Sequence, residues 1–203
     1  MENGHEWVDL GLPSGLKWAT CNVGADSPCD FGNYFCWAGV TPVIRDFEND
    51  ILLGSEFVYF DRGAWRYTKY VTNPEGVIAD NKYRLEPMDD AASVNWGGKW
   101  RMPTKADFIE LKKHCRHKWV TENGVEGLQF ISKKNGNSIF LPAAGSIDDP
   151  SKPGYWSSEL NSSETVGMDD GIANCLLFAA DGWLDTEIGS NRSTCFPVRP
   201  VTE

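Results

Sequence analysis

Tyr155-Trp156-Ser157-Ser158 opens, and Phe196-Pro197-Val198-Arg199-Pro200-Val201 closes, the stretch of sequence that decides the fold of this chain. Between these ends, short apolar runs are separated by Gly, Asp, Asn and Ser, a pattern typical of short strands joined by surface loops. Residues 155–201 carry seven carboxylates against two arginines and no lysine, a net −5 of the chain's formal −10. The two ends therefore have the character of framework, and the residues between them that of an acidic surface able to vary.

The composition of the whole chain indicates one domain, residues 1–203, with enough apolar residues (41%) and aromatic residues (12%) to form a core. The net charge of −10 disfavours nucleic acid and anionic membrane surfaces as partners. No run of apolar residues is long enough to span a bilayer, so we expect no membrane insertion. The first residues lack a signal-peptide pattern, which leaves a cytoplasmic protein and a fragment of a longer chain as alternatives.

The six cysteines allow two interpretations. They are Cys21, Cys29, Cys36, Cys115, Cys175 and Cys195. Cysteine is readily buried as a small apolar side chain and a chain of this length does not need disulfides, so we expect free, mostly buried thiols. At least one disulfide stays open as the alternative. The spacings match no zinc motif built from paired cysteines.

Two helices are expected. The clearer one begins after Pro103, because Thr104 and Asp107 form an approximate capping box. It continues with helical spacing through Phe108, Leu111, Lys112 and Cys115. A shorter helix is expected over Asp89–Val94, since its two leading aspartates favour the positive end of the helix dipole.

Two Asn-Gly pairs, Asn123-Gly124 and Asn135-Gly136, predict antiparallel hairpins, because each separates two strand-like runs and Asn-Gly suits a type I′ turn. Further short strands are expected at residues 7–10 and 16–20. Residues 40–87 show no regular period, and their scattered aromatic residues are expected to pin an irregular loop to the core. Strands that do not alternate with the helices predict an α+β fold.

Several blocks of the chain are familiar as a set. They are His5–Thr20, Asp89–Ala92, Asn95–Thr104, Asn137–Gly145, Tyr155–Ser158 and Val198–Val201. In this order they resemble the major paralogous domain named after Fibrobacter succinogenes, abundant in Bacteroidetes, and the resemblance covers nearly the whole chain. It implies a C-type lectin-like fold of the formylglycine-generating-enzyme branch, with long irregular loops. The first and last strands would pair at the base, and two helices would support an upper face of loops and short strands.

The same resemblance divides residues 155–201 into framework and variable positions. Some similar proteins are diversified by retroelements, which mutagenise a C-terminal segment to vary a ligand-binding face. Framework positions would be Trp156, Ala173, Phe178, Gly182, Arg192, Phe196 and Arg199. Exposed, variable positions would be Asn174, Cys175, Leu177, Trp183, Asp185, Glu187, Asn191, Ser193 and Thr194, to which we add Glu159 and Asn161 as ligand-binding residues.

Patterns that suggest chemistry have simpler explanations. The oxidase branch of the fold uses two close cysteines and copper, but Cys175 and Cys195 lack the flanking motif, so we expect no enzyme. His114 and His117 have a spacing that can hold a metal, yet no third ligand is near in sequence, and histidine also suits a helix C-terminus. We expect no cofactor, with structural Ca²⁺ at Asp148-Asp149 or Asp169-Asp170 as the alternative.

The sequence therefore predicts a non-enzymatic binding protein whose C-terminal face contacts a protein or glycan on a cell surface. Such a protein would act at a cell surface or on a phage particle, within a larger assembly, and its oligomeric state stays open. Trp183 is the expected anchor of the face; its alternative is to pack under its own loop. The alternative function is a structural domain of a larger bacterial surface or secreted protein, without a ligand face.

Overall fold

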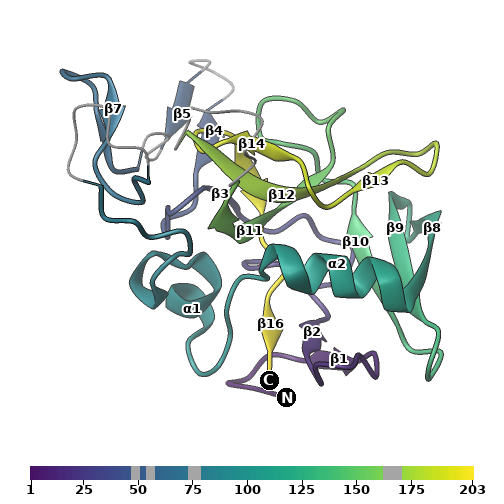
Figure 1. Cartoon of the computed structure of the whole chain (residues 1–203). Helices are drawn as coiled ribbons and strands as arrows, with labels where there is room; N and C mark the ends of the chain where they lie inside the picture. The colour runs from purple at the N-terminus through teal and green to yellow at the C-terminus, as the bar shows by residue number, and fades with distance from the viewer. Residues whose placement is uncertain (47–50, 54–57, 73–78, 162–170) are drawn as a thin grey trace.

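Short antiparallel strands and two α-helices make up the described part of the chain, which is therefore an α+β protein as predicted (Figure 1). The computed structural model describes residues 1–46, 51–53, 58–72, 79–161 and 171–203. The helical elements are η1 (Pro87–Asp89), α1 (Ala91–Trp96) and α2 (Lys105–His114).

Three larger sheets contain most of the strands. The first sheet has the spatial order β1 (Trp7–Asp9), β2 (Lys17–Ala19) and β16 (Val201–Thr202). The second has the order β10 (Ser138–Pro142), β9 (Val125–Ser132) and β8 (Cys115–Glu122). The third, which we call the central sheet, has the order β11 (Gly154–Leu160), β12 (Ile172–Phe178) and β13 (Leu184–Asp185), and β14 (Gly189–Asn191) also pairs with β12. Two-stranded sheets pair β3 (Tyr34–Cys36) with β15 (Cys195–Pro197), β4 (Ile44–Asp46) with β5 (Ile51–Leu53), and β6 (Phe60–Asp61) with β7 (Arg66–Tyr67).

The first and last strands of the chain meet in one sheet, where β2 pairs with β1 on one side and β16 on the other. Arg199, just before β16, is fully buried. Its guanidinium donates to Asn22 Oδ1 at 2.8 Å and to the Ala19 carbonyl at 3.0 Å. The Asn22 amide in turn donates to the Tyr155 hydroxyl at 3.2 Å. This network connects the C-terminal block to the end of β2 and to β11.

Helix α2 begins as the sequence predicts. The Thr104 hydroxyl accepts from the Asp107 N–H at 3.1 Å, and the Asp107 carboxylate accepts from the Thr104 N–H at 2.8 Å, which completes the capping box. Phe108 and Leu111 are buried under the β11–β12 sheet. We expected Cys115 to belong to this helix, and that prediction is wrong. The chain is already extended at Cys115, which begins β8.

The shorter helix lies two residues later than predicted. Asp90 caps α1 from outside, since its carboxylate accepts from the Ser93 N–H at 2.9 Å, and Asp89 belongs to the preceding 3-10 turn. The helix ends at Trp96, where Gly97 and Gly98 both take positive φ. In the described part of the chain, no helix is long and apolar enough to cross a membrane.

Both Asn-Gly pairs lie in hairpins, but only the first forms the predicted turn. Asn123 and Gly124 have φ of 50° and 83° and join β8 directly to β9, as a type I′ turn requires. In the second pair only Gly136 has positive φ. There the Ser132 hydroxyl accepts from the N–H groups of Lys134 and Asn135 at 3.1 and 3.2 Å, which shapes a wider loop between β9 and β10.

Strands β11 and β12 separate two apolar clusters, and successive residues alternate between them. One cluster contains Trp37, Trp100, Trp156, Ala173 and Cys175. The other contains Trp18, Phe108, Tyr155, Leu176 and Phe178. Both faces of the central sheet are therefore buried, and only its ends and its β13–β14 edge reach solvent.

One pair of cysteines departs from the expectation of free thiols. Cys36 and Cys195 form a disulfide, because the antiparallel pairing of β3 with β15 places them directly opposite each other. No local pattern reveals this contact, since 159 residues separate the two positions. The other thiols are free: Cys29, Cys115 and Cys175 are buried and Cys21 is half-buried.

The aromatic residues of the irregular region only partly pin it to the core. Tyr70 is fully buried and contacts Trp37 with ring centroids 5.2 Å apart. Trp65, by contrast, is 76% exposed at the turn between β6 and β7. Phe47 and Phe57, part of the same expectation, lie outside the described residues.

Replacement of Arg199 by Met tests the buried network. We expect the free energy of unfolding to fall by about 3–5 kcal/mol, because the Asn22 oxygen and two backbone carbonyls lose their donor inside the core. Urea unfolding followed by circular dichroism measures this loss. Arg116→Met, at an exposed position of β8, is the matched control and should cost little; an equal, small loss for both variants would contradict the role of Arg199.

Candidate functional site

The predicted ligand-binding segment, residues 155–201, contains all four strands of the central sheet, and its later part, β13 and β14, forms one edge of that sheet. Leu177 on β12 pairs with Asp185 on β13, and Ile172 pairs with Asn191 on β14, so β13 and β14 follow each other along the same side of β12. This edge is roughly 20 Å long at the usual rise of a strand. It lies above α2 in Figure 1, while both chain ends lie below the helix.

Several predicted residues are exposed along this edge, which we call the β13–β14 face (residues 181–194). Trp183 is 46% exposed beside the turn at Gly182, so it does not pack under its own loop. Glu187 and Asn191 are exposed, and Ser193 and Thr194 are half-buried. The face therefore presents one large aromatic ring among short polar and acidic side chains.

Asn174 and Cys175 do not belong to this face, and their predicted exposure is wrong. They retain only 3% and 1% exposure, because β12 is the central strand and its two faces meet the two apolar clusters. The Asn174 amide donates to the Leu160 carbonyl at 2.9 Å, and the Cys175 thiol lies among the aromatic residues of the first cluster. Leu177 is half-buried against the same cluster.

Two predicted carboxylates already have structural partners. Asp185 Oδ1 accepts from the N–H groups of Glu187 and Ile188 at 2.7 and 3.2 Å, which forms the break between β13 and β14. Glu159 lies on β11 and accepts from Arg84 Nη2 at 2.6 Å and from the N–H of Lys105, at the start of α2, at 3.0 Å. Both residues therefore shape the framework around the face.

Asn161 is half-buried directly after β11, and its backbone N–H donates to the Ile172 carbonyl at 3.1 Å. The residues that follow it, including the Asp169-Asp170 pair, lie outside the described part of the chain. Of the predicted framework positions, all but Gly182 are buried, and Gly182 has φ of 93° in the turn before Trp183.

The described residues offer little to a metal ion. Asp148 pairs with Arg45 at 3.2 Å and Asp149 with Lys152 at 2.8 Å, so both carboxylates of the candidate Ca²⁺ site face cations. Among the residues described, no group of three or more His, Cys, Asp or Glu side chains converges as metal ligands do, and this includes His114 and His117.

Arg192 connects the end of the β13–β14 face to residues 58–71, which form a layer beside it. Its buried guanidinium lies 3.9 Å from the centroid of the Tyr67 ring and 4.7 Å from that of Trp37. It also donates to the Lys69 carbonyl at 3.3 Å. Stacking on aromatic rings and donation to carbonyls are both well suited to a planar cation. The face is thereby connected to residues 58–71.

Asp89 holds that neighbouring layer in place. Its carboxylate accepts from the Tyr59 hydroxyl at 2.6 Å, from the Lys69 ammonium at 2.5 Å and from the Tyr70 hydroxyl. Burial alone would raise the pKa of Asp89, but hydrogen bonds from Lys69, Tyr59 and Tyr70 hold it below its usual value. The sequence contains no local sign of this cluster, because the three partners of Asp89 precede it by 19 to 30 residues.

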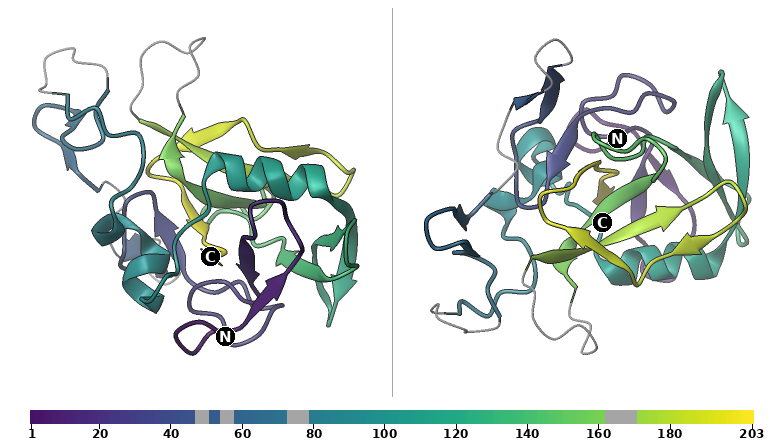
Figure 2. Two further views of the ribbon diagram at one scale, coloured as in Figure 1. Left: turned by 60° about the horizontal axis from the view of Figure 1, so that its bottom comes forward. Right: turned by 90° about the horizontal axis from the view of Figure 1, so that it is seen from above.

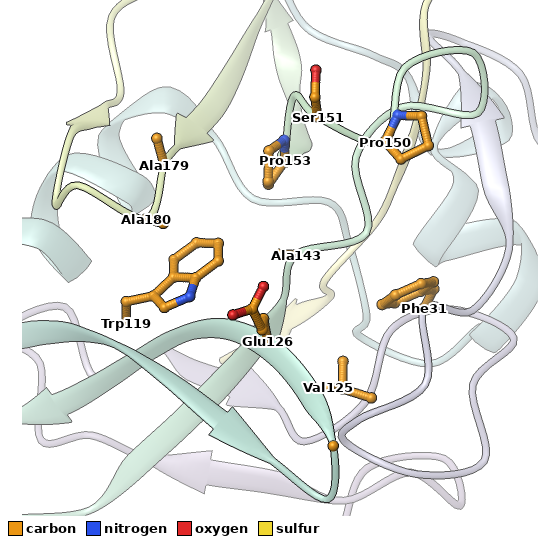
Figure 3. Close-up of a pocket in the computed structure, with 11 residues that line it drawn as sticks. Phe31, Trp119, Val125, Glu126, Ala143, Pro150, Ser151, Pro153, Ala179 and Ala180 are labelled. Carbon is orange, nitrogen blue, oxygen red and sulfur yellow. The ribbon is translucent and has the colours of Figure 1, made fainter.

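A pocket of about 470 Å³ adjoins the turn that leads into the face (Figure 3). Its walls come from the β8–β9 hairpin, the segment before β11, the end of β12 and the loop before β3. The residues that line it are Phe31, Trp119, Gly124, Val125, Glu126, Ala143, Pro150, Ser151, Pro153, Ala179 and Ala180. No pattern in the sequence predicts this pocket; the one local signal is the Asn123-Gly124 turn, which places Glu126 near a hairpin tip.

Comparison of the chain with protein-family models, with curated proteins and with solved structures gives no match.

The triple variant Trp183→Ser/Glu187→Ser/Asn191→Ser tests whether the face is independent of the core. Substitutions of exposed side chains usually change stability by no more than about 0.5 kcal/mol each, so the melting temperature should hardly change. Asn174→Leu is the contrasting variant. It should lower the melting temperature clearly, because the Leu160 carbonyl loses its donor inside the protein. Unfolding of the triple variant would place its side chains in the core instead.

Asp89→Asn tests the attachment of residues 58–71. At pH 7 the variant should lose about 2–3 kcal/mol, because three hydrogen bonds to a carboxylate are weakened. A carboxyl group whose pKa is lowered by folding contributes stability above its unfolded pKa of about 3.9, and this contribution is lost as pH falls through the folded value. Urea unfolding at pH 7 and at pH 3 should therefore show a difference between wild type and variant that shrinks in acid. A difference that is constant with pH would contradict an ionised Asp89.

Proposed function

We propose that this chain is a non-enzymatic ligand-binding and display protein, and that its β13–β14 face contacts a protein or glycan on a cell surface. The observation that carries the proposal is the position of Trp183, a large aromatic ring left 46% exposed beside a sheet whose other aromatic residues are buried. Solvent exposure of such a ring has no benefit to folding, whereas rigid aromatic rings are common binding anchors.

The division between framework and face supports this function. Trp156, Phe196 and Arg199 are buried, while Trp183, Glu187 and Asn191 project from an edge that makes no strand pair on its outer side among the described residues. These three exposed side chains can therefore change without repacking the core. A surface of this kind suits a binding protein that must accept new ligands.

The arrangement of the ends supports the finer fold assignment, a C-type lectin-like domain. The pairing of β2 with β1 and β16, the two helices and the upper layer of short strands all agree with what the resemblance of the sequence implies. With the ends at the base and the β13–β14 face at the opposite end, a larger surface or phage protein could carry the face outward (Figure 1).

The alternative function is a structural domain without a ligand face. The exposed Trp65 would favour it, because a second exposed ring on another hairpin shows that the chain carries exposed aromatic residues away from the β13–β14 face. The β6–β7 hairpin, which carries Trp65, and strand β13, which directly follows Trp183, lie on opposite sides of the molecule (Figure 2), so the rings of Trp65 and Trp183 would not form one contact surface. A contact with a neighbouring domain could then cover either ring.

Binding measurements on Trp183→Ala separate the two functions. Fluorescently labelled wild type is applied to printed bacterial glycans and to intact Bacteroidetes cells. Loss of an anchor residue typically costs about 2 kcal/mol, roughly a 30-fold weaker affinity, so the variant signal should fall accordingly. Trp65→Ala is the matched control and should bind like wild type. Retention of binding by Trp183→Ala, with loss in Trp65→Ala, would contradict the proposed face.

The DNA beside the gene tests whether the face is diversified. We expect a reverse transcriptase gene and an adenine-rich near-copy of the codons for residues 155–201. Mismatches between the copy and the gene should fall on codons of exposed positions, Trp183, Glu187 and Asn191 among them, and spare those of Asn174 and Cys175. If the reverse transcriptase gene and the near-copy are both absent, the face is not diversified and the protein binds one fixed ligand.

A further inference from the structure

Among the described residues that line the pocket beside the β13–β14 face, Glu126 is the only ionisable one. Its side chain is exposed, and its carboxylate has no hydrogen bond or ion pair with any residue in the described part of the chain. The nearby Lys152 already pairs with Asp149 at 2.8 Å. A carboxylate that faces a pocket without a cation of its own is available to a cation from outside.

The hairpin geometry explains why this carboxylate faces inward. Glu126 pairs with Thr121 and Trp119 pairs with Leu128, so all four side chains lie on the same face of β8 and β9. Leu128 is buried in the core on that face, and Trp119 contacts Phe178 with ring centroids 6.1 Å apart. The hairpin extends beyond the core, so its inward face continues past Leu128 and Trp119 to Glu126 at the pocket wall.

The other walls are aromatic and aliphatic. Trp119 is half-buried and Phe31, on the opposite wall, is 42% exposed (Figure 3). Pro150, Pro153 and Ala179 complete an apolar lining. Aromatic ring faces attract cations, and apolar walls accommodate the carbon stem of a lysine or arginine side chain while its charged end reaches a carboxylate.

We infer that this pocket binds a lysine or arginine side chain of a protein ligand that docks on the β13–β14 face. The inference rests on the proposed function and names the chemistry of the ligand: a protein with a basic residue at its contact surface. Ala179 and Ala180 line the pocket, and the Ala179 N–H donates to the Trp183 carbonyl at 2.9 Å, so pocket and face share one turn.

Charge complementarity favours a basic protein over a neutral glycan. The chain has a net charge of −10, and Asp181, Asp185 and Glu187 lie on the face. A negative surface attracts and orients a basic partner over distances comparable with the Debye length. The guanidinium or ammonium would pair with Glu126, and the adjoining surface of the partner would cover Trp183.

Titration with N-acetyl-arginine amide, followed by nuclear magnetic resonance of ¹⁵N-labelled protein, tests the inference. We expect saturable shifts at the amides of Gly124, Val125 and Glu126 and of Ala179 and Ala180, with weak affinity because the probe is small. Glu126→Gln should weaken binding by at least about fivefold, since charge-assisted contacts are lost. Added salt should weaken it as well.

Glu122→Gln is the matched control. It makes the same change of charge on the same hairpin, but Glu122 lies outside the pocket and accepts from Gln129 Nε2 at 3.1 Å. This variant should bind the probe like wild type. Equal binding by wild type and Glu126→Gln would overturn the inference, as would shifts caused by methyl glucoside with none caused by the arginine probe.

The outcome is separable from that of the proposed function. Suppose that Trp183→Ala loses cell binding and the protein does not respond to the arginine probe. This result would contradict the binding of a basic side chain in the pocket, and the β13–β14 face would still be the ligand-binding surface. Suppose instead that the protein responds to the probe only when Glu126 is present and that Trp183→Ala binds cells like wild type. This result would support the pocket as a site for basic side chains and contradict ligand binding by the β13–β14 face.

Discussion

The buried guanidinium of Arg199 is the contact on which the rest of the structure depends. It has no carboxylate partner among the residues described and is held by Asn22 and by backbone carbonyls at the end of β2. Asn22 also contacts Tyr155 at the start of the central sheet, and the Tyr155 hydroxyl donates to the Pro142 carbonyl at 2.9 Å at the end of β10. One cation thus fixes the relative positions of three sheets, and a cation in this place needs every one of its acceptors because it is cut off from water.

A central sheet between two apolar clusters explains how a rigid framework and a variable edge can coexist. In β12, Ala173 and Cys175 face one cluster and Leu176 and Phe178 face the other, so substitutions at these positions disturb the core. Substitutions at the exposed positions of this edge, such as Glu187 and Asn191, leave both clusters untouched, whereas Leu184 of β13 belongs to the second cluster. The turn made by Asp185 separates β13 from β14, so neither strand offers a long edge to another strand. Arg192 and Asp89 then connect this edge to residues 58–71, which places a second layer beside it.

Features determined by neighbours in sequence could be predicted, and features determined by the packing of distant segments could not. The capping box of Thr104 and the Asn123-Gly124 turn follow from local hydrogen bonds and backbone preferences, and both were predicted correctly. Asn174 and Cys175 were wrongly placed on the surface, because the polar Asn174 interrupts the apolar run of β12 and only the packing of distant segments covers both faces of the strand. The Cys36–Cys195 contact, the Asp89 cluster and the inward direction of Glu126 likewise depend on which segments the fold brings together.

The single disulfide among six cysteines has a consequence for thiol–disulfide exchange. Exchange begins with attack by a thiolate on an accessible sulfur, and both bonded sulfurs are buried. Burial raises the pKa of the Cys115 thiol to about 11 and that of the Cys175 thiol to about 12, so both stay protonated and unreactive at neutral pH. Wrong pairings therefore have to arise while the chain is unfolded. The conditions of oxidation during refolding would therefore determine which cysteines form disulfides. Once folded, the protein retains the Cys36–Cys195 disulfide in the presence of its own free thiols.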